Sequence, residues 1–80
     1  RVNTVHPDCV YDTDVWSAKI LKARAKQYGL SVGEYKRRNL LKTDVSSSDV
    51  AELVAFLAST KSSKTTGAQV PIDGGNDRII

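Results

Sequence analysis

The stretch from Val45 to Gly75 constrains the fold more than any other part of the chain. It reads VSSSDVAELVAFLASTKSSKTTGAQVPIDGG, in which Ser46 is followed three positions later by Asp49. A serine and an acid at this spacing are typical of a helix N-terminus, because their side chains satisfy backbone N–H groups that lack a partner within the helix. After the predicted helix come a polar loop at residues 59–66, a Thr-Gly turn, a short apolar strand and a Gly-Gly stop.

The predicted helix after Ser46 is apolar over most of its circumference. Its apolar positions are Val50, Leu53, Val54 and Leu57, broadened by Ala51, Ala55, Phe56 and Ala58. A helix of this kind is buried on more than one side. Eighty residues form one domain at most and offer too little protein to cover such a helix. We therefore expect either protein outside these residues or an oligomer to cover it.

Two strands are predicted near the ends of the chain. Residues 2–6 (VNTVH) alternate apolar and polar side chains, as a half-buried strand does, and Pro7 is expected to end this strand because it cannot donate a hydrogen bond. Residues 68–72 (AQVPI) alternate in the same way, and Pro71 favours an edge position or the end of the strand.

Two further helices are predicted between the first strand and the helix after Ser46. The first is expected to begin near Thr13 or Asp14, with Val15 among its apolar positions, and to end at Gly29. The second begins with the S-x-x-E capping box of residues 31–34 and is expected to reach Asn39 or Leu41. The complete predicted order is β-α-α-α-β.

Positive charge is concentrated in this central helical part. Apart from Glu34, all charged residues between Lys19 and Lys42 are lysine or arginine, whereas the net charge of the whole chain is only +3. A solvated helical face is the simpler interpretation. The alternative function is a small basic nucleic-acid-binding module that uses Lys19–Lys42.

The chain carries few groups that suit a catalyst or a metal site. His6 and Cys9 are its one histidine and one cysteine, too few for a zinc site. Nothing in the sequence orients His6 as a base, so Cys9 is interpreted as an inert thiol. Asp8, Asp12 and Asp14 lack the central glycine and closing glutamate of a calcium-binding EF-hand loop. No catalytic and no metal-binding residue is therefore predicted.

Three observations bear on where the protein is found. No apolar run approaches the roughly 20 residues that span a bilayer, so no membrane association is expected. A single unpaired cysteine fits a reducing cytoplasm, and we expect a cytoplasmic protein. The chain begins at Arg1 without an initiator methionine, which favours a processed, truncated or cloned fragment.

Three segments, taken together and in this order, resemble the C-terminal part of the short-chain dehydrogenase/reductase family. Arg1–Asp8 is similar to that family's R-V-N-x-V/I-x-P-G, Asp49–Ser59 to its D-V-A…F-L-x-S helix, and Thr66–Gly75 to its closing T-G…D-G-G. More narrowly, Tyr28–Ser31 and Arg38–Lys42 resemble the dehydrogenase half of bifunctional rhamnulose-1-phosphate aldolase/alcohol dehydrogenases.

The resemblance implies the C-terminal fragment of a Rossmann-like α/β fold. Residues 1–13 would form a strand and the loop at the cofactor edge, residues 14–44 a helical substrate lid, and residues 45–80 a helix, the closing strand and a tail. In that family the backbone of the edge loop meets the nicotinamide carboxamide of NAD or NADP. Carried over to this sequence, the cofactor-binding residues are Pro7, Asp8, Cys9, Val10 and Thr13.

This sequence departs from the family pattern in three ways. Asp8 replaces the usual glycine, which leaves the backbone less free to adopt a positive φ. Asp12 stands where a threonine often contacts the cofactor, and an acid there would repel a pyrophosphate. The glycine-rich cofactor loop and the catalytic Ser and Tyr-x-x-x-Lys are missing, so we expect this chain alone to be inactive. The implied partners are an upstream dinucleotide-binding part of the same polypeptide and further copies in a homo-oligomer.

Overall fold

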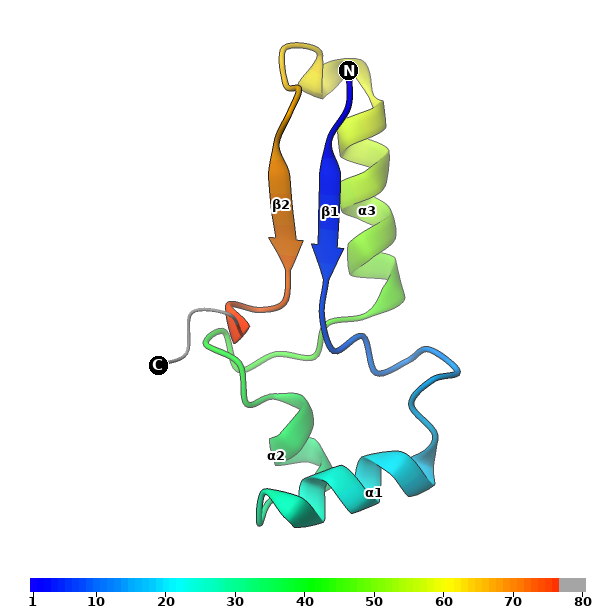
Figure 1. Ribbon diagram of the computed structural model, residues 1–80, viewed down its shortest axis with the longest axis vertical. Coiled ribbons are helices and arrows are strands. Elements are labelled where there is room, and N and C mark those ends of the chain that lie inside the picture. Colours follow the sequence, from blue (N-terminus) through cyan, green and yellow to red (C-terminus); the bar gives the residue numbers. More distant parts are fainter. Residues whose placement is uncertain (77–80) are drawn as a thin grey trace.

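The computed structural model describes residues 1–76, so the tail predicted at the end of the chain lies outside the described residues. The elements follow the predicted order β-α-α-α-β, with one short 3₁₀ turn added (Figure 1). They are β1 (Thr4–Pro7), α1 (Ala18–Gln27), α2 (Val32–Lys36), α3 (Ser47–Ala58), the 3₁₀ turn η1 (Thr60–Ser62) and β2 (Gln69–Ile72).

The two strands pair in parallel, and both begin later than predicted. Thr4 lies opposite Gln69, and Pro7 lies opposite Ile72. The sequence predicts that Pro7 stops the first strand, yet it is the last residue of β1. The N–H groups of Thr4 and Asp8 face β2. Because backbone N–H groups point alternately to the two edges of a strand, the nitrogen of Pro7 faces the edge away from β2. The pairing with β2 therefore needs no N–H donor from Pro7.

The amino ends of the strands are tied together by the first residues of the chain. The guanidinium of Arg1 donates to the Ser62 hydroxyl at 3.2 Å. The Asn3 side chain donates to the Thr65 carbonyl at 3.2 Å and accepts from the Ala68 N–H at 3.0 Å. The arginine and asparagine of the R-V-N segment therefore hold the turn before β2, at the end of the sheet opposite to α1 and α2 (Figure 1).

Helix α1 begins later than the sequence predicts. Its N-cap is Ser17, not Thr13 or Asp14, because the Thr13 hydroxyl donates locally to a backbone carbonyl and its own carbonyl accepts in a turn. Val15 consequently lies outside the helix and is 74% exposed. The predicted end is confirmed: Gly29 follows the helix with a φ of 68°, the left-handed conformation that a glycine adopts without steric cost.

Helix α2 begins as predicted and ends early. Ser31 and Glu34 form the reciprocal capping box. The helix stops at Lys36, short of the predicted Asn39 or Leu41, because the Asn39 side chain pairs with the backbone further along the chain and stabilises a loop instead.

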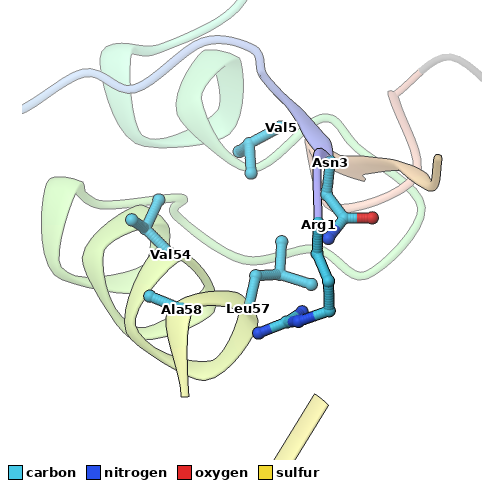
Figure 2. A pocket seen from close by; sticks show the side chains of 6 residues that line it. All are labelled: Arg1, Asn3, Val5, Val54, Leu57 and Ala58. Atoms are coloured by element: carbon cyan, nitrogen blue, oxygen red, sulfur yellow. The ribbon is translucent and has the colours of Figure 1, made fainter. Parts of the chain in front are cut away.

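Helix α3 is capped as predicted and is poorly covered. The Ser46 N–H donates to the Asp49 carboxylate at 2.8 Å, and the Asp49 N–H donates to the Ser46 hydroxyl at 3.3 Å. No residue of α3 is buried by the described part of the chain, and Phe56 is 47% exposed. An open groove of about 530 Å³ separates α3 from β1; Figure 2 shows its lining residues Arg1, Asn3, Val5, Val54, Leu57 and Ala58.

The principal apolar core lies beside the helical end of the molecule rather than under the sheet. Its buried residues come from the loop after β1, from α1 and from α2, and are Tyr11, Leu21, Ala25 and Tyr35. Figure 1 shows that α1 and α2 lie beyond the carboxyl ends of both strands. The fold thus places a packed helical unit next to the edge of the sheet where the strands end.

Candidate functional site

The loop at residues 8–13 leaves β1 at the carboxyl end of the parallel sheet (Figure 1). Pro7 is the last paired residue of β1, and the Asp8 N–H donates to the carbonyl of Ile72, the last residue of β2, at 3.2 Å. All five predicted cofactor residues therefore belong to the end of one strand and the loop that follows it. Open α/β sheets bind their ligands at this edge.

Asp8 and Cys9 give this loop its shape. The residue with a positive φ is Cys9, at 55°, and not Asp8, which stands in the glycine position of the family motif. The Asp8 carboxylate accepts from the Cys9 thiol at 3.3 Å and from the Asn76 side chain at 2.8 Å. Asp8 therefore links the loop after β1 to the segment after β2, and the left-handed turn falls one residue later.

Val10 presents backbone groups at the centre of the loop. Its carbonyl accepts from the Thr13 hydroxyl at 2.8 Å. None of the hydrogen bonds seen within residues 1–76 uses the Val10 N–H. Val10 is half-buried, and a backbone donor without a partner among residues 1–76 is suited to a ligand with a carbonyl oxygen.

The Asp12 side chain is bound by the first turn of α3. Its carboxylate accepts from the Ser47 N–H and from the Ser47 hydroxyl, both at 2.9 Å. The first turn of a helix carries the positive end of its dipole, which stabilises a negative charge placed there. The acid that is expected to repel a pyrophosphate thus has a structural partner.

An aromatic cluster lies directly behind the loop. The Tyr11 ring lies 4.8 Å from the Trp16 ring and 5.7 Å from the Tyr35 ring. The Arg38 guanidinium donates to the Tyr11 hydroxyl at 2.9 Å and lies 4.2 Å from the centre of the Tyr35 ring. Burial raises the pKa of Tyr11, whereas the hydrogen bond from Arg38 acts in the opposite direction.

Sequence reasoning does not find this cluster. Its members come from two separate segments, residues 11–16 and 35–38, and Tyr11 and Arg38 are 27 positions apart. One local signal is present: Arg38 follows Tyr35 by three positions, a spacing at which side chains are neighbours on a helix. In the structure α2 ends before Arg38, yet its guanidinium still reaches back to the Tyr35 carbonyl at 3.1 Å.

The basic side chains lie on the helical unit beyond the sheet. Arg37 and Asp44 form an ion pair at 4.0 Å, with about half of each side chain exposed. Such a pair contributes little to stability. A shallow groove of about 370 Å³ is lined by Leu30, Glu34, Arg37, Arg38 and Lys42.

Within residues 1–76, no cluster of three or more His, Cys, Asp or Glu side chains could hold a metal ion. In the same residues, no helix has both the length and the apolar character to cross a membrane.

Comparison with known proteins identifies relatives over nearly the whole chain. Residues 1–77 match the family model described as enoyl-(acyl carrier protein) reductase. The curated protein "Uncharacterized oxidoreductase YuxG" of Bacillus subtilis (strain 168) is 38% identical in an alignment 80 residues long that covers 94% of this chain and 12% of that protein. The crystal structure of a short chain dehydrogenase family protein from Francisella tularensis subsp. tularensis SCHU S4 matches with a TM-score of 0.71 at 37% identity, over 99% of this chain and 34% of that one.

The chain therefore spans a small part of each relative's length. Within that part, the matching region includes both strands, all three helices and the loop at residues 8–13. Two parallel strands joined through helices agree with the α/β fold that the motifs predict, and a basic nucleic-acid-binding module is not supported. The chain belongs to the short-chain dehydrogenase/reductase family of oxidoreductases.

Proposed function

We propose that these residues form the cofactor edge, the substrate lid and an oligomer contact of an NAD(P)-dependent short-chain alcohol dehydrogenase/reductase. The observation that carries the proposal is the position of the loop at residues 8–13, which follows β1 at the carboxyl edge of a parallel sheet. The glycine-rich cofactor loop and the catalytic Ser, Tyr and Lys would come from an upstream part of the same polypeptide.

The cofactor contact centres on Val10. Its N–H would donate to the carboxamide of NAD or NADP. Pro7 and Cys9 shape the backbone on either side of Asp8. The Thr13 hydroxyl donates to the Val10 carbonyl at 2.8 Å and fixes its position. The left-handed conformation of Cys9 supports this role, because residues in unusual backbone conformations are frequent at binding sites. When bound, the dinucleotide supplies hydride transfer.

The helical unit of α1 and α2 forms the lid over the substrate. It lies beyond the strand ends, beside the loop at residues 8–13 (Figure 1). A lid in this position excludes water from the reaction and completes the site when it closes. The basic side chains of Lys19–Lys42 give the lid an electrostatic attraction for an anionic substrate or for the phosphate of NADP.

The exposed apolar side of α3 belongs to contacts with protein outside these residues. Val54 is 48% exposed, and the groove between α3 and β1 is open. The upstream part of the polypeptide would fill the groove, and a second copy would cover the outer side of α3. We further propose that the complete protein is a bifunctional aldolase/dehydrogenase located in the cytoplasm. The length of YuxG, of which this chain spans 12%, leaves room for a second domain of this kind.

Two substitutions at Val10 test the cofactor contact in the complete polypeptide. Val10→Pro removes the backbone N–H, and Val10→Ala keeps it. We expect Val10→Pro to raise the Kd for NADH by about tenfold, the loss expected for one good hydrogen bond to a ligand, and Val10→Ala to change it by less than about twofold. Proline also disfavours some conformations of the residue before it, so circular dichroism must show that both variants are folded. Equal Kd values for both folded variants would refute the contact.

A further inference from the structure

We propose that Arg38 is a positioning residue that holds the loop at residues 8–13 in its cofactor-binding shape by joining that loop to the helical lid. The inference rests on the proposed function. It concerns a side chain that would not touch the cofactor itself, and it adds to the function a physical link between the lid and the cofactor edge.

The Arg38 guanidinium contacts three tyrosines. Nη1 of Arg38 donates to the Tyr11 hydroxyl at 2.9 Å and to the Tyr35 carbonyl at 3.1 Å. The guanidinium carbon also lies 4.2 Å from the centre of the Tyr35 ring and 5.3 Å from that of the Tyr28 ring. Arginine stacks on aromatic faces and donates in the plane of its fork at the same time. Arg38 therefore bridges the loop, the end of α1 and the helix α2.

Tyr11 is next to the backbone that would meet the cofactor. It follows Val10 directly, so a displacement of Tyr11 is transmitted through one rigid peptide unit to the backbone that would meet the cofactor. Tyr11 is 7% exposed, and its ring packs against Trp16 and Tyr35. A buried hydroxyl without a partner is costly, so the bond from Arg38 favours this one placement of the ring.

Two adjacent residues of the loop, Tyr11 and Asp12, are each anchored by a hydrogen bond from elsewhere in the chain. Tyr11 is held by Arg38, and Asp12 is held by Ser47 of α3 through two bonds of 2.9 Å. Arg38 follows α2, whereas Ser47 belongs to α3. Without Arg38 the loop loses its bond to the lid and keeps those from Ser47 and from Asn76. It then populates more conformations, so the apparent affinity for the cofactor falls with the fraction that remains competent to bind.

The test uses the complete polypeptide and NADH. NADH lacks the extra phosphate of NADPH, so attraction between that phosphate and the basic lid does not contribute to the measured Kd. We expect Arg38→Met to raise the Kd for NADH by about tenfold. Tyr11→Phe, which removes only the hydroxyl that Arg38 binds, should also raise the Kd for NADH. The double variant should lose no more than the worse single variant, because both substitutions break one interaction. Arg38→Lys should restore part of the affinity, since lysine keeps the charge and a donor but not the fork.

Two controls separate positioning from stability and from charge. Ser62→Ala removes a buried hydroxyl that bonds the carbonyls of Phe56 and Leu57 at the opposite end of the sheet. It should lower the melting temperature and leave the Kd for NADH unchanged. Lys61→Met removes an exposed charge at the same distant end and should alter neither quantity.

Each outcome of this test decides the inference. If wild type binds NADH and Arg38→Met binds equally well, the positioning role is refuted and the proposed function stands. If Ser62→Ala weakens binding as much as Arg38→Met at the same loss of melting temperature, the effect is one of general stability and the inference is refuted. If the wild-type protein binds neither NADH nor NADPH, both the proposed function and the role of Arg38 are refuted.

Discussion

At the scale of single residues, Gly74 shows how closely the segment after β2 approaches the end of the lid. Its φ is 62°, and a Cβ built on it would lie 2.5 Å from the side-chain carbon of Asn39. Asn39 cannot yield easily, because it is buried and its amide bonds both backbone groups of Thr43, at 2.8 and 3.2 Å. The Leu41 N–H donates to the Gly74 carbonyl at 3.0 Å in the same contact. Gly74, the first glycine of the D-G-G motif, is thus required by packing as well as by its backbone conformation.

Gly74→Ala should therefore destabilise the protein by more than its backbone conformation alone explains. Gly67 is the matched control, because its φ is 70° and a Cβ at this position would have no neighbour within 4 Å. We expect a loss of about 1 kcal/mol in the free energy of unfolding for Gly67→Ala and about 3 kcal/mol for Gly74→Ala, which adds the overlap with Asn39. Urea denaturation of the complete polypeptide measures both. Equal losses would show that Asn39 does not enforce the glycine.

At the scale of elements, the start of α3 depends on an ionised carboxylate. Hydrogen bonds from the backbone and the side chain of Ser46 hold the pKa of Asp49 below its ordinary value of 3.8. Since the folded state lowers this pKa, the stabilisation is present above the ordinary value and is lost as the pH falls through the folded pKa. The Asp12 carboxylate, which binds Ser47 in the same turn, adds a second acid to this helix end.

We expect the first turn of α3 to loosen as the pH is lowered below about 4, in the range where aspartates protonate. Hydrogen exchange of the Ser46 N–H, which donates to Asp49 at 2.8 Å, should accelerate over this range relative to amides in the middle of the helix. Asp49→Asn should show fast exchange at Ser46 already at neutral pH. An exchange rate that follows only the intrinsic pH dependence of a free amide in both proteins would contradict this account of the cap.

Local chemistry determines which elements the sequence predicts well. Both capping boxes, Ser31 with Glu34 and Ser46 with Asp49, span three positions and are found where predicted. The start of α1 is predicted wrongly because Ser17 competes with Thr13 as an N-cap, and the Thr13 hydroxyl bonds back to the loop. Choosing between two plausible caps requires knowledge of the loop's shape, which the residues near it in sequence do not determine.

The candidate site depends on contacts that are distant in sequence, so only its location is predictable. The motif Arg1–Asp8 indicates where the loop begins, and the structure places that loop at the expected edge of the sheet. The anchors of the loop join Asp12 to Ser47 across 35 positions and Tyr11 to Arg38 across 27. No spacing rule of a helix or strand connects such pairs, and they become visible only when the elements are assembled.

At the scale of the whole molecule, the described residues lack the layers that a parallel sheet requires. Parallel sheets are normally covered on both faces and rarely consist of two strands. Here β1 and β2 form the sheet alone within residues 1–76, and the groove beside β1 is open on the side of α3. We therefore propose that apolar residues of α3 and β1 contact protein outside the described residues.

The isolated 80-residue chain should accordingly behave as an incomplete domain. We expect it to bind a hydrophobic dye, to self-associate in light scattering and to show no oxidation of an alcohol with NAD or NADP, because it has no Tyr-x-x-x-Lys. Val54→Ser, which alters one of the groove residues, should reduce the dye signal. A monomer that excludes the dye and unfolds cooperatively would contradict the expectation.

If the loop at residues 8–13 is the cofactor edge of a dehydrogenase, its backbone amides must respond when NADH binds. Titration of the isotope-labelled complete polypeptide with NADH, followed through its backbone amide resonances, measures this response. We expect the resonances of the Val10 amide and its neighbours in the loop to shift with saturation, whereas those of η1, at the opposite end of the sheet, stay in place. Saturable binding of NADH that leaves the resonances of residues 8–13 unchanged would contradict this assignment of the loop.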